Sequence, residues 1–352
     1  MIDLLSMDQS DMETFLIAHG FPKFRGKQLY QWLHKQEVFS FDAMTNLPKD
    51  LKSFLKANTY LSRGILKAVS PSKDGETVKF LLQFGDDLIE TVMMHYHRKN
   101  ARDRNTLCVS TQVGCGMGCK FCATGQGGLK RNLTVGEIVD QVNFANEYLR
   151  EAGESPISNL VYMGMGEPFA NYDAMLKSIC ILNDAKEIGM RRITVSTCGL
   201  IPEIQNLAAE KMQLILAVSL HGASDEIRTK LMPINKRYPL KELMAALDHY
   251  IKETGRRVTI EYALFQGIND RDEDAKALVE ILKNNLYHVN LVPGNPVDGT
   301  GLRSSAPERI KAFLQILESG HIPVSIRESK GRDIDGACGQ LRAKYQKFLK
   351  KH

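Results

Sequence analysis

Cys115-Gly116-Met117-Gly118-Cys119-Lys120-Phe121-Cys122 places three thiols in the spacing C-x3-C-x2-C, in a loop that contains two glycines. Structural zinc sites take four ligands from the chain, and a cubic iron–sulfur cluster normally takes one cysteine for each iron. Three thiols leave one coordination position of the metal site without a protein ligand, and an open position keeps room for a reactant. The stretch therefore predicts a metal site that binds a second molecule.

The co-substrate that best fits an open iron is S-adenosylmethionine (SAM), because its amino and carboxylate groups can chelate one metal. An electron passed to the sulfonium would then break its bond to the adenosyl carbon and yield a radical. The alternative is a zinc loop that a distant His or Cys completes. No second C-x2-C or H-x3-H pair follows at zinc-finger spacing, which favours the iron–sulfur cluster.

The composition is that of a globular protein, with 352 residues of which 43% are hydrophobic and 25% are charged. No apolar run approaches a membrane span, and the start of the chain carries acids where a signal peptide would carry bases. Seven cysteines, several of them in a ligand-like cluster, argue against a secreted disulfide scaffold. We therefore expect a cytoplasmic protein with no membrane contact.

The net charge of +5 does not by itself identify a nucleic-acid binder. Local basic runs are more suggestive, although each alone is also typical of a solvated surface. Together they are compatible with a polyanionic partner. The runs comprise Lys23, Arg25, Lys27, Arg98, Lys99, Arg102, Arg104, Lys130, Arg131, Arg342, Lys344, Lys347, Lys350 and Lys351.

Hydrophobic periodicity divides the chain into four segments. Residues 1–60 predict a helical accessory module, and residues 61–104 predict β-hairpins with turns at Asp74-Gly75 and Gly85-Asp86. Residues 105–342 alternate β-rich runs with amphipathic helices, which predicts an open, partial (β/α)6-type barrel of the α/β class, and residues 343–352 form a basic tail. The expected barrel strands are Leu107–Thr111, Leu160–Met163, Ile193–Thr197, Leu214–Leu220, Val258–Leu264, Val289–Val292 and Pro323–Ile326.

Polar residues follow the carboxyl ends of these strands. In such barrels the catalytic residues lie at the carboxyl ends of the strands, so we expect these residues to face one cavity together with the cysteine loop. They are Gly164-Met165-Gly166-Glu167-Pro168, Ser196, Ser219-Leu220-His221 and Asn295-Pro296.

With these motifs in view, the chain resembles the RlmN/Cfr family of radical SAM RNA methyltransferases over nearly its full length. The most specific matches are the cysteine loop with its flanks Cys108–Gly114 and Ala123–Gly125, the Gly-Met-Gly-Glu-Pro stretch, and Asp333–Leu341. The resemblance implies one [4Fe–4S] cluster per chain on Cys115, Cys119 and Cys122. It implies SAM contacts at Gly166, Glu167, Ser196, Ser219, Leu220, His221 and Asn295.

The family's mechanism also implies roles for three further residues. Cys338 would take a methyl group from one SAM, and a second SAM would generate the radical that activates this methyl for addition to C2 of adenine. Cys108 would resolve the product by forming a disulfide with Cys338, and Glu90 would be the general base. From the residues alone, Cys338 and Cys108 are also typical of structural thiols, Glu90 of a solvated hairpin face, and His221 of a hydrogen-bonded core histidine.

Two cysteines have no matching role. We expect Cys180 in the core, on an apolar helix face, and Cys198 near the cavity without a function.

The resemblance implies an adenosine in the peptidyl-transferase region of 23S rRNA and the adenosine beside the tRNA anticodon as substrates. It further implies an electron donor such as flavodoxin, and we expect a monomer. The alternative is Cfr-type methylation at C8 of the ribosomal adenosine, and Pro168 favours the RlmN side. Gly294 departs from the aromatic residue that often precedes Asn-Pro in the family, which leaves the packing of this part of the SAM pocket open.

Overall fold

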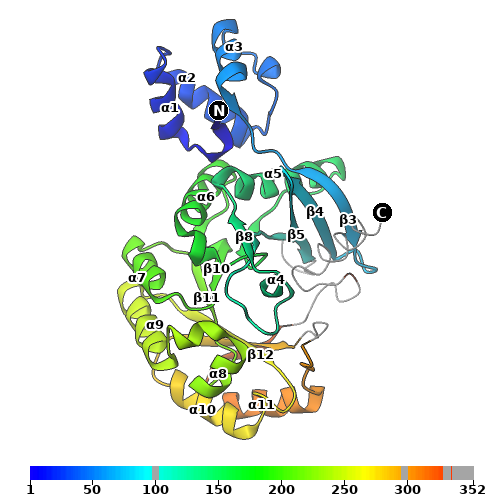
Figure 1. Cartoon of the computed structure of the whole chain (residues 1–352), viewed down its shortest axis with the longest axis vertical. Coiled ribbons are helices and arrows are strands. Elements are labelled where there is room, and N and C mark those ends of the chain that lie inside the picture. The colour runs from blue at the N-terminus through cyan, green and yellow to red at the C-terminus, as the bar shows by residue number, and fades with distance from the viewer. Residues whose placement is uncertain (97–102, 295–299, 328–333, 335–352) are drawn as a thin grey trace.

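The computed structural model describes residues 1–96, 103–294, 300–327 and 334. A helical module, an antiparallel β extension and an open α/β barrel follow one another along the chain (Figure 1). The predicted α/β class with a partial barrel is confirmed. None of the helices in the described ranges is long and apolar enough to cross a membrane.

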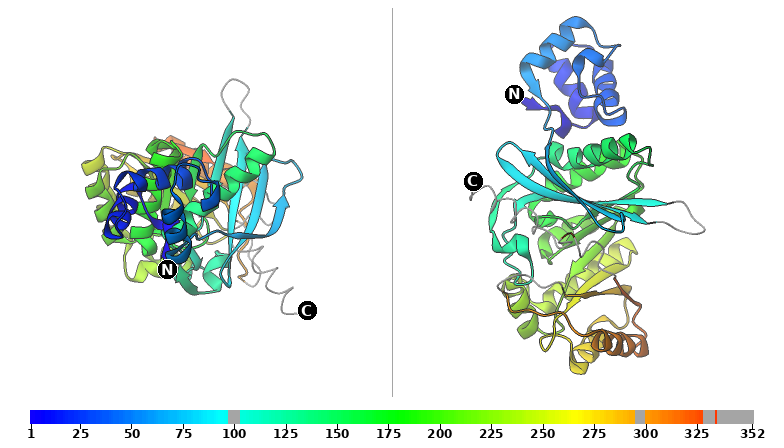
Figure 2. Two further views of the ribbon diagram at one scale, coloured as in Figure 1. Left: turned by 90° about the horizontal axis from the view of Figure 1, so that it is seen from above. Right: turned by 90° about the vertical axis from the view of Figure 1, so that its right-hand side faces the viewer.

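The N-terminal module packs around a small core of its own (Figure 2). Helix α1 (Gln9–Ala18) starts with a capping box, in which the Asp8 carboxylate accepts the N–H of Asp11 and the Asp11 carboxylate accepts that of Asp8. Gly26 lets helix α2 (Phe24–Tyr30) approach α1, because a Cβ there would lie 2.5 Å from the backbone of Glu13. The module also contains β1 (Ile2–Asp3), the π-helical turn Gln31–Lys35, α3 (Lys49–Asn58) and β2 (Thr59–Tyr60), which is parallel to β1.

The barrel and the extension share one sheet of ten strands in the order β14-β13-β12-β11-β10-β9-β6-β5-β4-β3. The barrel strands are parallel: β6 (Arg104–Cys108), β9 (Asn159–Tyr162), β10 (Ile193–Thr197), β11 (Ile215–Ser219), β12 (Val258–Leu264), β13 (Tyr287–Pro293) and β14 (Val324–Ile326). The extension is an antiparallel meander of β3 (Ile65–Pro71), β4 (Thr77–Phe84) and β5 (Asp87–Tyr96) that pairs with β6. Within the described residues β14 and β3 are the two edges, so the sheet does not close.

Helices cover the outer face of the barrel strands (Figures 1 and 2). Alternate strand residues such as Leu160, Val195 and Leu216 are fully buried in the core between the sheet and these helices. Helix α5 begins with a capping box, in which Thr134 Oγ1 accepts the N–H of Glu137 at 3.2 Å. The helices are α5 (Val135–Glu151), α6 (Tyr172–Ala185), α7 (Ile201–Glu210), α8 (Asp225–Leu231), α9 (Leu240–Thr254), α10 (Asp272–Leu282) and α11 (Pro307–Ser319).

The structure corrects the prediction for the first barrel strand, which spans Arg104–Cys108 rather than Leu107–Thr111. After Cys108 the backbone bonds with other elements: the N–H of Ser110 donates to the Gln141 side chain at 2.8 Å, and that of Thr111 to the Met165 carbonyl at 2.8 Å. The chain then enters a separate hairpin, β7 (Gln112–Gly114) and β8 (Leu129–Asn132), which carries the cysteine loop.

The structure also corrects the prediction for Cys180. This thiol is exposed on α6, whereas its neighbours Ile179 and Ile181 are buried. Cys180 therefore lies outside the apolar face of α6.

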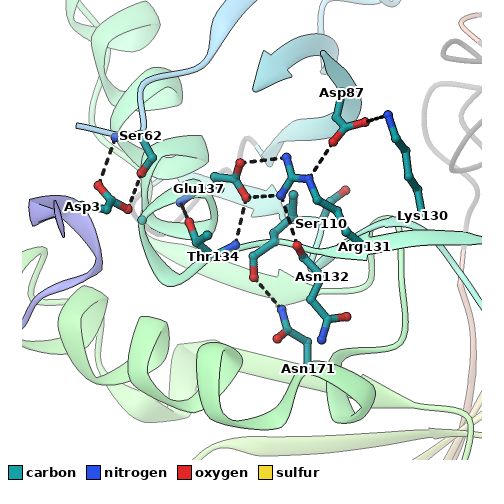
Figure 3. A network of polar contacts seen from close by, with 12 residues as sticks. Asp3, Ser62, Asp87, Ser110, Lys130, Arg131, Asn132, Thr134, Glu137 and Asn171 are labelled. Atoms are coloured by element: carbon teal, nitrogen blue, oxygen red, sulfur yellow. Dashed lines mark hydrogen bonds and ion pairs between the residues drawn. The ribbon is translucent and has the colours of Figure 1, made fainter. Parts of the chain in front are cut away.

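A polar network holds the β7–β8 hairpin against the rest of the fold (Figure 3). Arg131 of β8 donates from Nε to Asp87 of β5 at 2.6 Å, and from Nη1 and Nη2 to Glu137 of α5 at 2.7 and 2.9 Å. Partial burial would raise the pKa of Asp87, but hydrogen bonds from Lys130 and Arg131 outweigh it and lower this pKa. The guanidinium therefore fastens the hairpin to both the extension and the barrel.

Glu37 joins the N-terminal module to the barrel. Its backbone lies in the left-handed region, with φ at 56°, and its buried carboxylate receives Nζ of Lys186 at 2.7 Å and the Asn146 amide at 2.9 Å. A second link runs from Arg63, which donates to Asp140 at 2.6 Å. These contacts set the position of the module relative to α5 and α6.

Candidate active site

Three cysteines stand on one wall of a cavity of about 310 Å³ at the carboxyl ends of the barrel strands. Cys115 follows β7, and Cys119 and Cys122 precede the short helix α4 (Ala123–Gln126). Gly114 makes the turn into the loop, with φ at 85° and a Cβ position only 2.0 Å from the Gly128 carbonyl oxygen. No side chain larger than hydrogen fits there, so the glycine fixes the start of the loop.

The thiols of the loop interact with one another. Burial raises the pKa of Cys115 to about 11 and also raises that of Cys119, and the charge of neighbouring loop thiolates adds to both shifts. Within the described residues, no three His, Cys, Asp or Glu side chains converge closely enough to hold a single metal ion. The three thiols line one cavity, as a cluster in which each thiolate binds its own iron requires.

Glu167 stands in the same cavity, in the loop after β9, and is 4% exposed. Its carboxylate accepts the N–H of Phe169 at 3.1 Å and that of Cys198 at 2.8 Å. Burial raises its pKa against the opposing effect of these donors. The carboxylate is therefore held in place and can receive a cationic ligand group.

Gly166 gives the loop after β9 a backbone conformation that other residues rarely adopt. Its φ is 103°, and a Cβ would lie 2.6 Å from Cβ of Gln112, whose side-chain oxygen accepts the N–H of Glu167 at 2.8 Å. An L-residue at this position would strain the backbone and push against Gln112.

His221 closes the cavity beside the cysteine loop, and its ring lies edge-on to Phe121 with the centroids 4.6 Å apart. Its Nδ1 accepts the N–H of Ala263 at 2.9 Å, which places the ring proton on Nε2. Burial, with a smaller contribution from Arg228, lowers its pKa to about 3. The imidazole is therefore neutral and offers one N–H donor.

The predicted strand-end residues meet here. The cavity is lined by Cys115, Cys119, Cys122, Gly166, Glu167, Ser196, Ser219 and His221, among others. Leu220 is fully buried, and its side chain does not line the cavity. Asn295 and Cys338 lie outside the described residues.

Comparisons with known proteins agree with this geometry. Residues 109–279 match the model of the radical SAM superfamily, and residues 2–61 match that of the ribosomal RNA large subunit methyltransferase N-terminal domain. A probable dual-specificity RNA methyltransferase RlmN of Moorella thermoacetica is 46% identical, over 97% of both chains. The corresponding protein of Geobacillus thermodenitrificans is 47% identical, over 98% of this chain and 93% of its own.

The chain belongs to the RlmN family. A crystal structure of a radical SAM methyltransferase from Sphaerobacter thermophilus shares its fold, with a TM-score of 0.90 and 45% identity over 97% of this chain and 99% of the other. Membership implies a [4Fe–4S] cluster and SAM, and the thiols and the carboxylate of the cavity fit these groups.

Two residues that the RlmN resemblance selects lie beside the cavity rather than in it. Cys108 ends β6 and pairs with Val92 of β5, so Glu90, two residues earlier on β5, lies on the same face. The backbone of Met163, which lines the cavity, hydrogen-bonds the Cys108 sulfur. Burial raises the pKa of Cys108 to about 11, with a partial offset from Arg327.

Glu90 is not a solvated hairpin residue. It is 1% exposed, and its Oε2 lies 3.1 Å from Nζ of Lys79, which is fully buried. A buried ion pair therefore stands next to Cys108.

Sequence reasoning missed several residues that line the cavity. Glu261 lies on β12, and Phe265 directly follows this strand. We predicted no cavity residue at the end of β12. Cys198, which we expected near the cavity without a function, does line it and donates its N–H to Glu167.

Proposed function

We propose that this chain is a radical SAM RNA methyltransferase that acts on C2 of an adenosine in 23S rRNA and of the adenosine 3′ of the tRNA anticodon. The observation that carries the proposal is one cavity lined by the three thiols of the cysteine loop and by the buried carboxylate of Glu167. The names of relatives that are 44–47% identical support RNA as the substrate.

The proposed cofactors are one [4Fe–4S] cluster per chain and two SAM molecules per turnover. A cluster held by Cys115, Cys119 and Cys122 would supply the electron that cleaves SAM at its sulfonium. Glu167 would receive the SAM ammonium group, because its carboxylate is already oriented by two backbone N–H donors. A flavodoxin-like donor would supply electrons, and the chain would act as a monomer.

The remaining polar groups of the cavity would orient SAM. Ser196 and Ser219 present hydroxyl groups at the ends of β10 and β11, and His221 presents one N–H donor. Leu220 can contribute only through its backbone, since its side chain is in the core. Asn295 is assigned by resemblance.

Protein sulfur would carry the methyl group. Adenine C2 is electron-poor and does not attack a sulfonium methyl, so a carrier nucleophile is needed, and the family resemblance assigns this role to Cys338. Cys108 would then attack the Cys338 sulfur and release the methylated base as a disulfide forms. Glu90 would take the proton from the methylated carbon, and its place beside Cys108 supports this assignment.

The experiment is an anaerobic reaction of reconstituted protein with SAM, a reductant and RNA, followed by nuclease digestion and mass spectrometry. We expect 2-methyladenosine, and a Cys115→Ala variant without a bound cluster should form none. If 8-methyladenosine forms instead, the chain has the Cfr-type activity. If neither product forms while the cluster is intact, the proposal is wrong.

A further inference from the structure

A second cavity opens on the inner face of the sheet, beneath the cluster cavity. Its volume is about 520 Å³, within the range of small-ligand sites, and we call it the lower cavity. It shares Met163 and Glu261 with the cluster cavity. Its walls come mainly from the amino-terminal halves of the parallel strands: Arg104, Thr106, Asn159, Val161, Arg192, Thr194, Ile215, Arg257, Thr259, His288, Asn290, Ser325 and Arg327, with Met94 and Tyr96 from β5.

The lower cavity is strongly basic. Four arginines line it, Arg104, Arg192, Arg257 and Arg327, against one carboxylate, that of Glu261. Among the described residues, none of the four forms an ion pair with an acid: Arg104 lies over the Tyr96 ring at 4.1 Å, and Arg327 donates to Met163 Sδ at 3.5 Å. A concave surface lined by one sign of charge concentrates ions of the opposite sign.

Buried polar atoms in the lower cavity also lack partners. In the described part of the chain, Thr106 Oγ1, Arg104 Nε and His288 Nδ1 are shielded from solvent and form no hydrogen bond, and Thr106 is 5% exposed. Buried polar groups are usually satisfied, and leaving one unpaired costs about 1–3 kcal/mol. Three residues of the cavity wall therefore keep hydrogen-bonding capacity that the described part of the protein does not use.

Glu261, the one acidic residue named above for the lower cavity, already accepts a hydrogen bond. Asn290 donates to Glu261 Oε1 at 2.9 Å, and Ser325 donates to Asn290 at 2.9 Å. His288 Nε2 lies 2.9 Å from Ser325 Oγ, so this chain of contacts ends at a ring whose other nitrogen is unpaired. The four arginines outnumber this one carboxylate and leave the net charge of the cavity positive.

We propose that the lower cavity binds a backbone phosphate of the substrate RNA, next to the nucleotide whose base enters the cluster cavity. Guanidinium groups match phosphate oxygens with paired N–H donors, and a threonine hydroxyl adds a further donor. Met163 and Glu261 line both cavities, so the two cavities are adjacent. This inference rests on the proposed RNA substrate.

Two arginines allow a matched test. Arg192 and Arg257 are exposed and precede β10 and β12, so substitution should leave the fold intact. Their sequence neighbours Arg191 and Arg256 do not line the lower cavity. The pair Arg192→Gln/Arg257→Gln and the pair Arg191→Gln/Arg256→Gln therefore remove the same charge from adjacent positions.

The assay measures binding of a labelled anticodon stem-loop RNA to full-length protein by fluorescence anisotropy over a range of salt concentrations, without SAM or reductant. The cavity pair should bind more weakly, and the slope of log affinity against log salt should fall by about one for each lost phosphate contact. The control pair should keep the wild-type slope. Equal thermal midpoints for both pairs would show that the variants are folded.

A second arm separates an RNA phosphate from a free anion. A stem-loop with a neutral methylphosphonate beside the target adenosine should bind wild-type protein more weakly, and the cavity pair should not distinguish the two RNAs. Equal slopes for the cavity and control pairs overturn the inference, even if calorimetry shows that inorganic pyrophosphate binds the arginines. A wild-type protein that binds no RNA at low salt would instead remove the proposed substrate itself.

Discussion

The buried pair of Lys79 and Glu90 predicts how a Glu90→Gln variant will behave. The charged atoms are 3.1 Å apart, and the two side chains are 0% and 1% exposed. Removing one partner of such a pair leaves a charge in surroundings that solvate it poorly, at a cost of about 3–5 kcal/mol. Because domains are stable by only about 5–15 kcal/mol, Glu90→Gln should lose a large share of its free energy of unfolding.

Urea denaturation followed by circular dichroism measures this loss. Glu90→Gln and Lys79→Met should each lower the free energy of unfolding by about 3–5 kcal/mol. The double variant Lys79→Met/Glu90→Gln removes both charges of the pair and should recover most of the stability that either single variant loses. An unchanged free energy of unfolding in Glu90→Gln would refute the argument from the buried charge.

The double variant also separates stability from chemistry. If Glu90 is the base, this variant should be stable, bind its cluster and cleave SAM to 5′-deoxyadenosine, yet form no methylated adenosine. Methylation that returns together with stability would exclude the base role of Glu90. The single variant cannot make this distinction, because it changes both properties at once.

Gly166→Ala should weaken SAM binding without loss of iron, because the new Cβ would lie 2.6 Å from Gln112. Gly189→Ala is the matched control, since a Cβ at that position has no atom within 4 Å. Equilibrium dialysis measures the SAM affinity of both variants. Glu167→Gln should bind SAM at least about tenfold more weakly, and equal affinity would exclude the ammonium contact. Cys108→Ala should trap protein covalently on RNA, as seen by denaturing electrophoresis, and Cys338→Ala should give no adduct. Burial lowers the pKa of His34 to about 3 from 6.5, so below about pH 6.5 the unfolded chain binds a proton that the folded chain does not. The free energy of unfolding should therefore fall as the pH falls below about 6.5, and it should fall less steeply in His34→Gln. Parallel curves for the two proteins would contradict this.

The sequence alone predicted those parts of the fold whose signal is local. Runs such as Ile193–Thr197 and Val258–Leu264 are β-rich and bounded by helical patterns, so their strands were found. The cysteine loop was found by its own spacing. Glu167 was found because it follows a strand, and parallel strands bring their carboxyl ends together. Burial and periodicity were sufficient for these features.

Features that depend on pairing between distant segments were not predictable. Cys108 and Glu90 share a face only because Val92 pairs with Cys108, and no local pattern fixes that register. Every residue of β12 from Val258 to Leu264 is buried, so alternation could not show that Glu261 points into the barrel. The arginines of the lower cavity lie in or directly beside four strands that are far apart in sequence.

The cysteine loop belongs to a two-stranded hairpin that adds no strand to the ten-stranded sheet. The pairing of the barrel strands therefore does not run through the cluster ligands, whereas the fold of a zinc finger depends on its metal. Variants of the three loop cysteines should accordingly keep the far-ultraviolet circular dichroism of the barrel, and loss of that signal in Cys115→Ala would show that the loop and the sheet depend on each other.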